Sequence, residues 1–252
     1  MARQTGIIKL KGTIGGVSFY KTRDGHLARE KGGVDKNRIM NDPAFQRTRE
    51  NGSEFGRAGA AGKLLRTAIR ALLINASDFR MVSRLTRDMV KVLQEDQVSE
   101  RGLRNVLDGE LELLHGFEFN ISGKLGTTLY APFTGTIDRA LGELSVDLIS
   151  FVPINMISAP SGTTHFRIVS AGAEIDFEAG TYVAQDTGTV ILPYDATATA
   201  PINLVNAVTA ASTKPLFLVL GIEFYQEING TQYPLKNGSY NACSLVKIDG
   251  GV

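Results

Sequence analysis

The sequence predicts an α+β protein, in which an N-terminal β-hairpin arm and an α-helical hairpin are followed by a C-terminal antiparallel β-sandwich. Two short β-prone runs flank the turn dipeptide Asp24-Gly25, which is a hairpin signal. Between residues 54 and 93, apolar residues recur every three or four positions, as in amphipathic helices. After Gly109 this period gives way to β-branched residues, glycines and regular turn signals. We therefore expect a basic glycine-rich arm (1–52), a helical segment (53–108) and an acidic β-sandwich domain (109–252).

The arm is expected to contain one hairpin and little else that is regular. Its two strands fall within residues 13–30, and a lone hairpin is not stable in water, so it should dock on another surface. Residues 31–52 are polar and lack a sustained period. Within them, Asn41-Asp42-Pro43 is typical of a helix cap followed by a first-turn proline, which opens a short helix through Phe45, Arg47 and Arg49. We expect an extended segment with one or two helical turns there.

The helical segment should form an antiparallel pair of helices. The first apolar stripe runs to Leu73 and the second begins at Phe79, and caps between Asn75 and Asp78 leave only a short connection. Ser99-Glu100 predicts the start of a third short helix, which Gly109 could end.

The C-terminal part should consist of strands joined by tight turns. Asn229-Gly230 is the best hairpin signal, and Asn237-Gly238 follows it, so the last three strands are expected to form a meander. Residues 195–213 are rich in Ala and Thr and indicate a surface connection or an edge segment. The candidate strands are 110–120, 127–134, 143–151, 164–170, 173–178, 188–193, 216–228 and 239–248.

Charge divides the chain although the total is close to neutral. Residues 1–105 contain 21 Lys and Arg against 11 Asp and Glu, a net of +10, whereas residues 106–252 contain 6 against 15, a net of −9. Such asymmetry suggests that the basic part meets an external polyanion or the acidic part of a neighbouring copy.

Cations and aromatic residues alternate in the basic part, as they do in nucleic-acid-binding arms. We rank docking on the acidic β-domain of the next subunit first, nucleic-acid binding second and a solvated cationic face third. Lys31 belongs to the same cluster. The candidate contact residues are Lys9, Lys11, Phe19, Tyr20, Lys21, Arg23, Arg29, Arg38, Arg47, Arg49 and Arg57.

Patterns of nucleotide and metal sites are weak. The segment Gly56 to Lys63 resembles a phosphate-binding loop only superficially, because Arg57 stands where the loop needs glycine and Leu64 where it needs Ser or Thr. The three histidines are scattered without a second ligand at metal spacing. We expect no cofactor and no metal.

Patterns of catalysis are equally weak. Cys243 lies in an apolar run and is expected to be a buried, inert thiol. The acidic pairs Glu110/Glu112 and Asp176/Glu178 alternate as on the wet face of a strand, which favours solvation over an acid pair. We expect a protein that is not an enzyme.

The N-terminus lacks the apolar stretch of a secretory signal, and Leu216 to Ile222 is far shorter than the ~20 residues that span a bilayer. We expect synthesis and folding in the cytoplasm and no membrane partner. A virion or particle is compatible as the final location, because virion proteins also lack signals.

Three runs in the first quarter of the chain carry a resemblance: Gly12-Thr-Ile-Gly-Gly-Val-Ser-Phe-Tyr-Lys, Arg29-Glu-Lys-Gly-Gly, and Ile39-Met-Asn-Asp-Pro-Ala-Phe-Gln-Arg-Thr-Arg-Glu-Asn. Together they resemble the N-terminal signature of small uncharacterised proteins from Bacteroidota and their phages or mobile elements. The resemblance implies a bacterial or phage context and a separate N-terminal module, and it transfers no functional residue. The expected function is a structural protein that self-assembles through its arm, as a phage or phage-like particle component or a filament subunit. The alternative is a nucleic-acid-binding protein.

Overall fold

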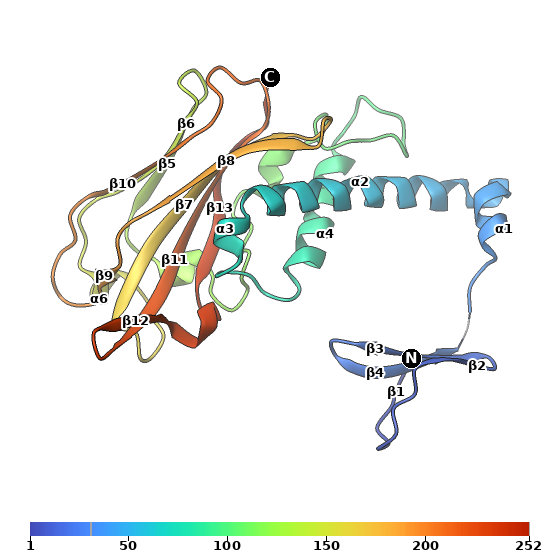
Figure 1. Ribbon diagram of the computed structural model, residues 1–252. Coiled ribbons are helices and arrows are strands. Elements are labelled where there is room, and N and C mark those ends of the chain that lie inside the picture. The colour runs from blue at the N-terminus through green and yellow to red at the C-terminus, as the bar shows by residue number, and fades with distance from the viewer. Residues whose placement is uncertain (31, 252) are drawn as a thin grey trace. The chain divides into compact units, whose positions relative to one another are not determined.

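The computed structural model describes residues 1–30 and 32–251, which form two compact units, 1–49 and 50–252 (Figure 1). We call residues 1–49 the N-terminal unit and residues 50–252 the body, and describe each by itself. The candidate cation Lys31 lies outside the described residues.

The N-terminal unit contains an antiparallel sheet with the strand order β1-β4-β3-β2. The predicted hairpin is confirmed: β3 and β4 are joined at Arg23-Asp24, and Gly25 takes the positive φ of +119° that glycine tolerates. A second tight turn at Gly15-Gly16 joins β2 to β3 and was not predicted. The strands are β1 (Ala2–Arg3), β2 (Gly12–Ile14), β3 (Val17–Thr22) and β4 (Gly25–Glu30).

A short helix, α1 (Lys36–Asn41), and the 3-10 turn η1 (Pro43–Phe45) follow the sheet. The predicted cap is present, because the Asp42 carboxylate accepts a hydrogen bond from Ala44 N at 2.9 Å. The short helix predicted after Pro43, through Phe45, Arg47 and Arg49, is confirmed, but the predicted irregular course between it and residue 52 is wrong. Helix α2 begins at Gln46, directly after the capped turn, so the expected boundary between 52 and 53 falls inside a helix.

The predicted helical hairpin is confirmed, and it belongs to the body from residue 50 onward. Helix α2 (Gln46–Ala68) and α4 (Met81–Gln94) pack together, and α3 (Arg70–Leu73) lies in their connection. The helices pack closely at Gly62, where a Cβ would make ordinary contact with Leu85 Cγ at 3.5 Å and Met89 Cγ at 3.7 Å. The small residues near Lys63 are therefore helix packing residues, and no loop forms there.

The predicted third helix after Ser99 is absent, and an irregular loop takes its place. The Asp96 side chain is buried and accepts hydrogen bonds from the backbone N–H groups of Val98, Ser99 and Asn105, at 2.8–3.0 Å. Burial opposes ionisation of this carboxyl, but the N–H groups of Ser99 and Asn105 outweigh it and lower the pKa of Asp96 to about 2. The Asp96 carboxylate thus binds backbone N–H groups that would otherwise form the internal hydrogen bonds of a helix.

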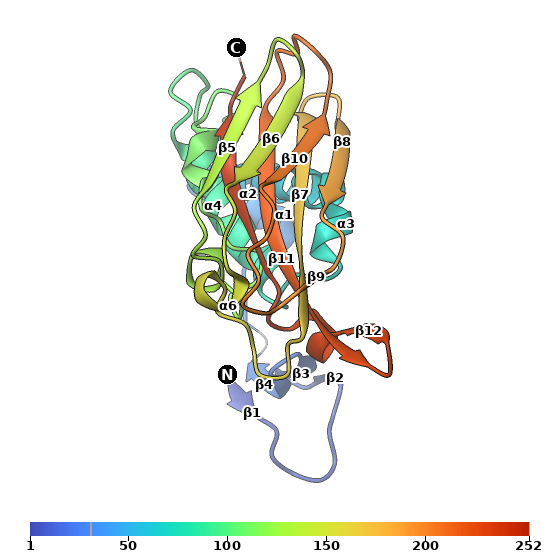
Figure 2. The same ribbon diagram turned by 90° about the vertical axis from the view of Figure 1, so that its left-hand side faces the viewer.

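The rest of the body is mostly antiparallel sheet, as predicted. One sheet has the order β10-β6-β5. The other sheet has six strands, with β7 and β11 paired at its centre. Strands β12 and β13 pair with the edge of β11 that faces away from β7, and β8 and β9 pair with the edge of β7 that faces away from β11 (Figure 2). The elements are η2 (Leu111–Leu114), α5 (Leu125–Thr128), β5 (Phe133–Asp138), β6 (Glu143–Leu148), α6 (Pro153–Met156), β7 (His165–Asp176), β8 (Thr181–Gly188), β9 (Leu192–Pro193), β10 (Ile202–Ala207), β11 (Leu216–Ile228), β12 (Thr231–Pro234), η3 (Leu235–Gly238) and β13 (Ala242–Asp249).

Two apolar cores lie on opposite faces of the six-stranded sheet. One core joins β7, β11 and β13 to the helices α2 and α4. The other joins the opposite face of β7 and β11 to β6 and β10 of the three-stranded sheet. Along β11 the side chains alternate between them, so that Phe217 and Val219 face the helices whereas Leu218 and Leu220 face the second sheet.

Several strand predictions need correction. The run 110–120 is η2 plus a single bridge at Glu118, because its leucines pack as one turn against β13 and α4. The predicted meander is wrong, since β13 pairs with β11 and not with β12. Strand β8 was missed. The edge interpretation of residues 195–213 is confirmed by β10, whereas the turn at Asn229-Gly230 forms as expected. No helix in the described part of the chain is both long and apolar enough to cross a bilayer.

Candidate assembly surface

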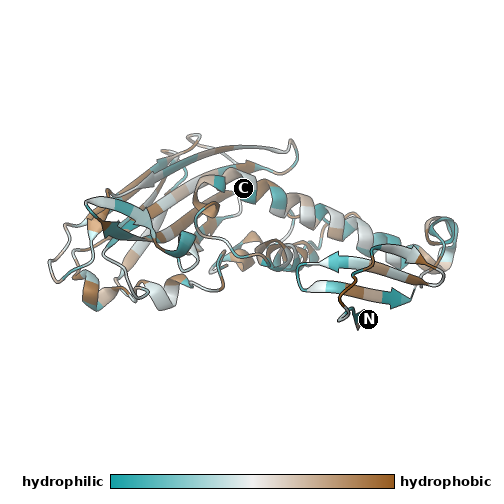
Figure 3. Cartoon of the chain, turned by 60° about the horizontal axis from the view of Figure 1, so that its bottom comes forward, coloured by the Kyte–Doolittle hydropathy of each residue, from teal (hydrophilic) through white to brown (hydrophobic). Residues whose placement is uncertain are grey.

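The sheet of the N-terminal unit has polar residues on both faces, and one face also carries an apolar cluster. Strand register places Ile14, Val17, Phe19 and Ala28 on that face, which we call the apolar face, together with Lys21, His26 and Glu30. The opposite face carries Tyr20, Leu27, Arg29 and Arg3. Figure 3 shows hydrophobic residues on these strands. The apolar face therefore carries an apolar cluster on β2, β3 and β4, which a sheet buries by packing against a partner.

Nothing inside the unit supplies that partner, because none of its described residues is buried. Exposed fractions reach 102% at Ile7, 81% at Ile8 and 62% at Ile14. Single exposed apolar residues are ordinary, but a whole unit without a core is not. The unit lacks the apolar burial that would offset the entropy lost on folding.

The structure gathers some of the predicted contact residues and separates others. Phe19, Tyr20, Lys21, Arg23 and Arg29 lie together on the β3–β4 hairpin, and the Arg29 guanidinium lies 5.5 Å from the centre of the Tyr20 ring. Lys9 and Lys11 precede β2 in a loop, where Lys9 Nζ donates to Gln4 O at 2.6 Å. Arg38 lies on α1, and Arg47, Arg49 and Arg57 lie on α2.

Three of these arginines have structural roles that the sequence did not reveal. Arg49 donates to the carbonyls of Ile39 and Asp42 at 2.7 and 3.0 Å. Arg38 pairs with the Asp42 carboxylate at 3.2 Å. Arg57 donates to the carbonyls of Gly102 and Arg104 at 2.7 and 2.9 Å, across about 45 residues of sequence. Because Arg57 belongs to the body, it is the least suitable contact residue of the set.

The acidic pairs of the body are also structural. Asp176 ends β7 and accepts from Ala179 N at 2.9 Å and from Lys214 Nζ at 2.9 Å, and these two interactions lower the pKa of Asp176. Glu112 accepts from Gly250 N at 2.8 Å. The hydrogen bond that Glu110 shares with the Glu112 side chain, and the negative charge of Glu112, raise the pKa of Glu110. Neither pair lies on a strand face as predicted, because one caps a turn and the other flanks η2.

A further group of polar residues in the body is joined by hydrogen bonds around Glu223. Glu223 is buried and accepts from Asn75 Nδ2 at 2.8 Å and from the Tyr225 hydroxyl at 2.7 Å. Burial and this hydrogen bond raise the pKa of Tyr225 to about 12. Burial also raises the pKa of the Cys243 thiol, which is fully buried, as the sequence predicted. The Cys243 thiol is therefore protonated and enclosed by the core.

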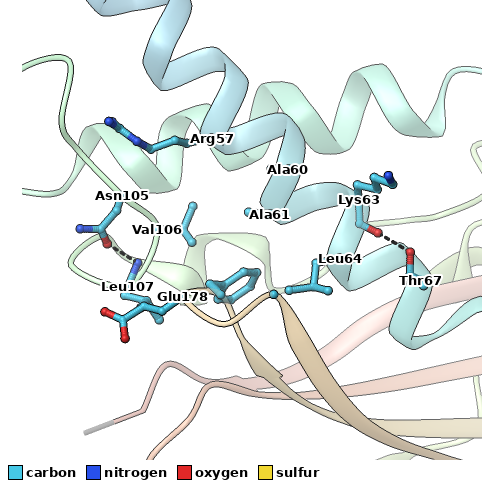
Figure 4. A pocket seen from close by; sticks show the side chains of 12 residues that line it. Arg57, Ala60, Ala61, Lys63, Leu64, Thr67, Asn105, Val106, Leu107 and Glu178 are labelled. Carbon is cyan, nitrogen blue, oxygen red and sulfur yellow. Dashed lines mark hydrogen bonds between the residues drawn. The ribbon is translucent and has the colours of Figure 1, made fainter.

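A pocket of about 580 Å³ lies in the body between α2, the loop at 105–107 and the β7–β8 turn. Figure 4 shows Ala61, Leu64 and Val106 around it, with Asn105 and Glu178 on one side. Its walls can accept an apolar side chain or a small apolar group. Among its described lining residues there is no histidine, cysteine or serine, and groups of three or more metal-ligating side chains are absent from the described part of the chain.

No family model, curated protein or solved structure matches the chain. The functional assignment therefore depends on the geometry, and the coreless N-terminal sheet is its most distinctive feature.

Proposed function

We propose that this protein is a non-enzymatic structural subunit that self-assembles through its N-terminal unit. The observation behind the proposal is that the unit folds into a sheet without burying any described residue. Small units are usually stabilised by disulfides, metals or association. The only cysteine of the chain is Cys243, in the body, so no disulfide can form within the unit. Association with another surface is the remaining source of stability that the residues offer.

Charge supports a second copy of the chain as that surface. Residues 1–49 contain 11 Lys and Arg against 4 Asp and Glu, a net of +7, whereas residues 50–252 contain 16 against 22, a net of −6. Opposite net charges steer a basic unit onto the acidic body of a neighbour. A contact between different surfaces of identical subunits is heterologous and produces rings or filaments.

The body acts in this proposal as a β-sandwich scaffold with a helical layer, in which two sheets share one core. The N-terminal motifs, which resemble those of small proteins from Bacteroidota and their phages or mobile elements, favour a phage or phage-like particle component over a cellular filament. A folded body with a terminal unit that binds another subunit fits both a particle component and a filament subunit.

Two adjacent positions of β2 provide the test. Ile14 lies on the apolar face and Thr13 on the opposite face of the same strand. Ile14→Glu and Thr13→Glu add the same charge to the same edge, so they differ only in the face that they alter. Ile14→Glu should weaken assembly by at least about tenfold, because apolar burial worth roughly 1–2 kcal/mol is lost and a charge is buried.

Analytical ultracentrifugation of the two variants and the wild type, at low and high salt, measures the effect. Wild type and Thr13→Glu should form large species that dissociate as salt screens the opposite charges. A monodisperse monomer in wild-type solutions at low salt would show that the proposal is wrong.

Nucleic-acid binding is a second candidate, because Arg3 and Arg29 share one face of the sheet with Tyr20. A stacking ring beside cations suits single-stranded nucleic acid. Its affinity should fall linearly with salt on logarithmic axes. Absence of any mobility shift with DNA or RNA at low salt would exclude this candidate.

A further inference from the structure

Strand β8 is an unusually open edge of the body. It pairs with β7 through all eight of its residues, and Figure 2 shows it at the border of the sheet. Residues 181–186 are exposed on both faces, including Tyr182 at 44% and Val183 at 46%. Within the described part of the chain, no backbone hydrogen bond reaches the outer side of β8. The strand thus offers a row of free amide and carbonyl groups.

Other edges of the body are covered or interrupted. Residues 116–119 pair with the outer side of β13, with Phe119 N donating to Cys243 O at 2.8 Å. Lys247 Nζ covers the edge of β5 by donating to Gly135 O at 3.1 Å. Strand β12 has four residues and ends in Pro234, and the end of β10 is bonded to the Gln185 side chain through Ala207 N. These are the usual protections of a sheet edge.

Strand β8 is bonded to β10 only near its C-terminal end, through the side chains of Gln185 and Thr187, and its first four residues lack these protections. Its sequence, Thr-Tyr-Val-Ala-Gln-Asp-Thr-Gly, has no proline, lysine or arginine, and its pairing with β7 shows no bulge. Long, exposed edges of this kind bind another strand. The outer main-chain edge of β8 is therefore open, whereas the edges of β5, β12 and β13 are protected.

We propose that β8 of one copy binds the edge strand β2 of a second copy, so that the N-terminal sheet continues the six-stranded sheet of its neighbour. This inference rests on the proposed function and names the acceptor surface. Main-chain hydrogen bonds between the two strands supply the affinity, as in other complexes formed by strand addition.

Charge and shape favour β2 as the occupant. Strand β2 is itself a free edge, because it pairs only with β3, and Lys9 and Lys11 precede it. On the acceptor, Asp186 lies on β8 and Glu178 in the turn before it, so lysines meet carboxylates. Pairing of β2 with β8 also places the apolar face around Ile14 beside an exposed apolar residue of β8, because Val183 is exposed on one face of β8 and Tyr182 on the other.

The pocket described above supplies specificity at one end of this edge. Phe177 and Gly180, in the turn that leads into β8, line it. An apolar side chain that flanks the added strand can enter a pocket so placed, and such pockets give strand addition its sequence preference.

Disulfide trapping in the full-length chain tests the proposal, and Cys243 does not interfere because it is fully buried. A Thr13→Cys chain is mixed under mild oxidation with a Tyr182→Cys chain, and separately with a Val183→Cys chain. Because residues 182 and 183 point to opposite faces of β8, one of them lies on the same face as the thiol of residue 13 whichever face is continued. Tyr233→Cys, on the exposed edge strand β12, is the matched control.

The expected result is a mixed disulfide with Tyr182→Cys or Val183→Cys that forms at least about tenfold faster than with Tyr233→Cys, since paired strands hold thiols at millimolar effective concentration. Equal rates at β8 and β12 would overturn the proposal. So would faster cross-linking of Val183→Cys to itself, which would indicate symmetric pairing of two β8 strands. If Ile14→Glu still disrupts assembly while β8 fails to cross-link, the N-terminal unit assembles the protein through another acceptor. If wild type does not assemble at all, the proposed function itself fails.

Discussion

Replacing Gly172 by alanine should destabilise the body, because the added methyl group pushes its two packed sheets apart. Gly172 lies on β7 and faces the three-stranded sheet, where an added Cβ would stand 2.8 Å from the Asn206 Cβ and 3.2 Å from the Leu144 Cβ. Both neighbours are first side-chain atoms, so rotation of a side chain cannot relieve the contact. The strands must shift by several tenths of an ångström, and overpacking of this kind costs about 1–3 kcal/mol.

A second cost arises because Asn206 is buried and hydrogen-bonded. Its Nδ2 donates to Ser170 Oγ at 2.8 Å and its Oδ1 accepts from Thr187 Oγ at 3.0 Å. Displacing a buried amide from its partners costs about 1–3 kcal/mol more. We therefore expect Gly172→Ala to lower the free energy of unfolding by roughly 2–5 kcal/mol.

Urea denaturation followed by circular dichroism measures this loss. Gly126→Ala serves as the control, because a Cβ there meets no atom within 4 Å. The control should stay within about 0.5 kcal/mol of wild type or gain slightly. A Gly172→Ala protein as stable as the control would refute the close sheet contact.

Three further outcomes follow from single residues. Asp96→Ala should lower the free energy of unfolding by about 2–4 kcal/mol at neutral pH, since three backbone amides lose a charged acceptor. Because the folded pKa of Asp96 is below the unfolded value, its stabilisation is present above pH 4 and lost between about pH 4 and 2. The difference in melting temperature between wild type and variant should shrink over that range, and a constant difference would contradict the role of the carboxylate. Gly62→Ala should raise the free energy of unfolding by about 0.5–1 kcal/mol, because alanine favours the helix and its Cβ would make ordinary contact with Leu85. The midpoint of urea denaturation should therefore rise, and a lower midpoint would show that α2 and α4 lie closer together. Cys243 should not react with a maleimide in the native protein and should react fully in denaturant, so rapid native labelling would show that β13 is exposed.

Local chemistry explains what the sequence predicted well. Turns at Asp24-Gly25 and Asn229-Gly230 depend on a few adjacent residues, and the helical hairpin depends on a period visible within each helix. The irregular loop after Asp96 escaped prediction because its carboxylate bonds to an amide nine residues ahead. Strand β8 escaped because both of its faces are exposed, which removes the alternation that marks a half-buried strand.

The candidate surface was predictable only in part. The cluster of cations and aromatics around Tyr20 is visible in the sequence, and the structure brings those residues together on one hairpin. Which cations are used internally is not visible, because the carbonyls that Arg57 binds lie far along the chain. The absence of a core in the N-terminal unit also required strand register, since a run such as Val17 to Thr22 has the composition of an ordinary half-buried strand.

The position of β11 between two cores has a consequence for how the body comes apart. Its alternate side chains support the helical layer on one side and the three-stranded sheet on the other, so neither layer can detach without exposing half of the same strand. Residues 50–252 should therefore unfold as one cooperative block, with the β11 amides exchanging hydrogen only through global opening. No described residue of the N-terminal sheet belongs to either core, so changes within this sheet should leave the packing of both cores intact.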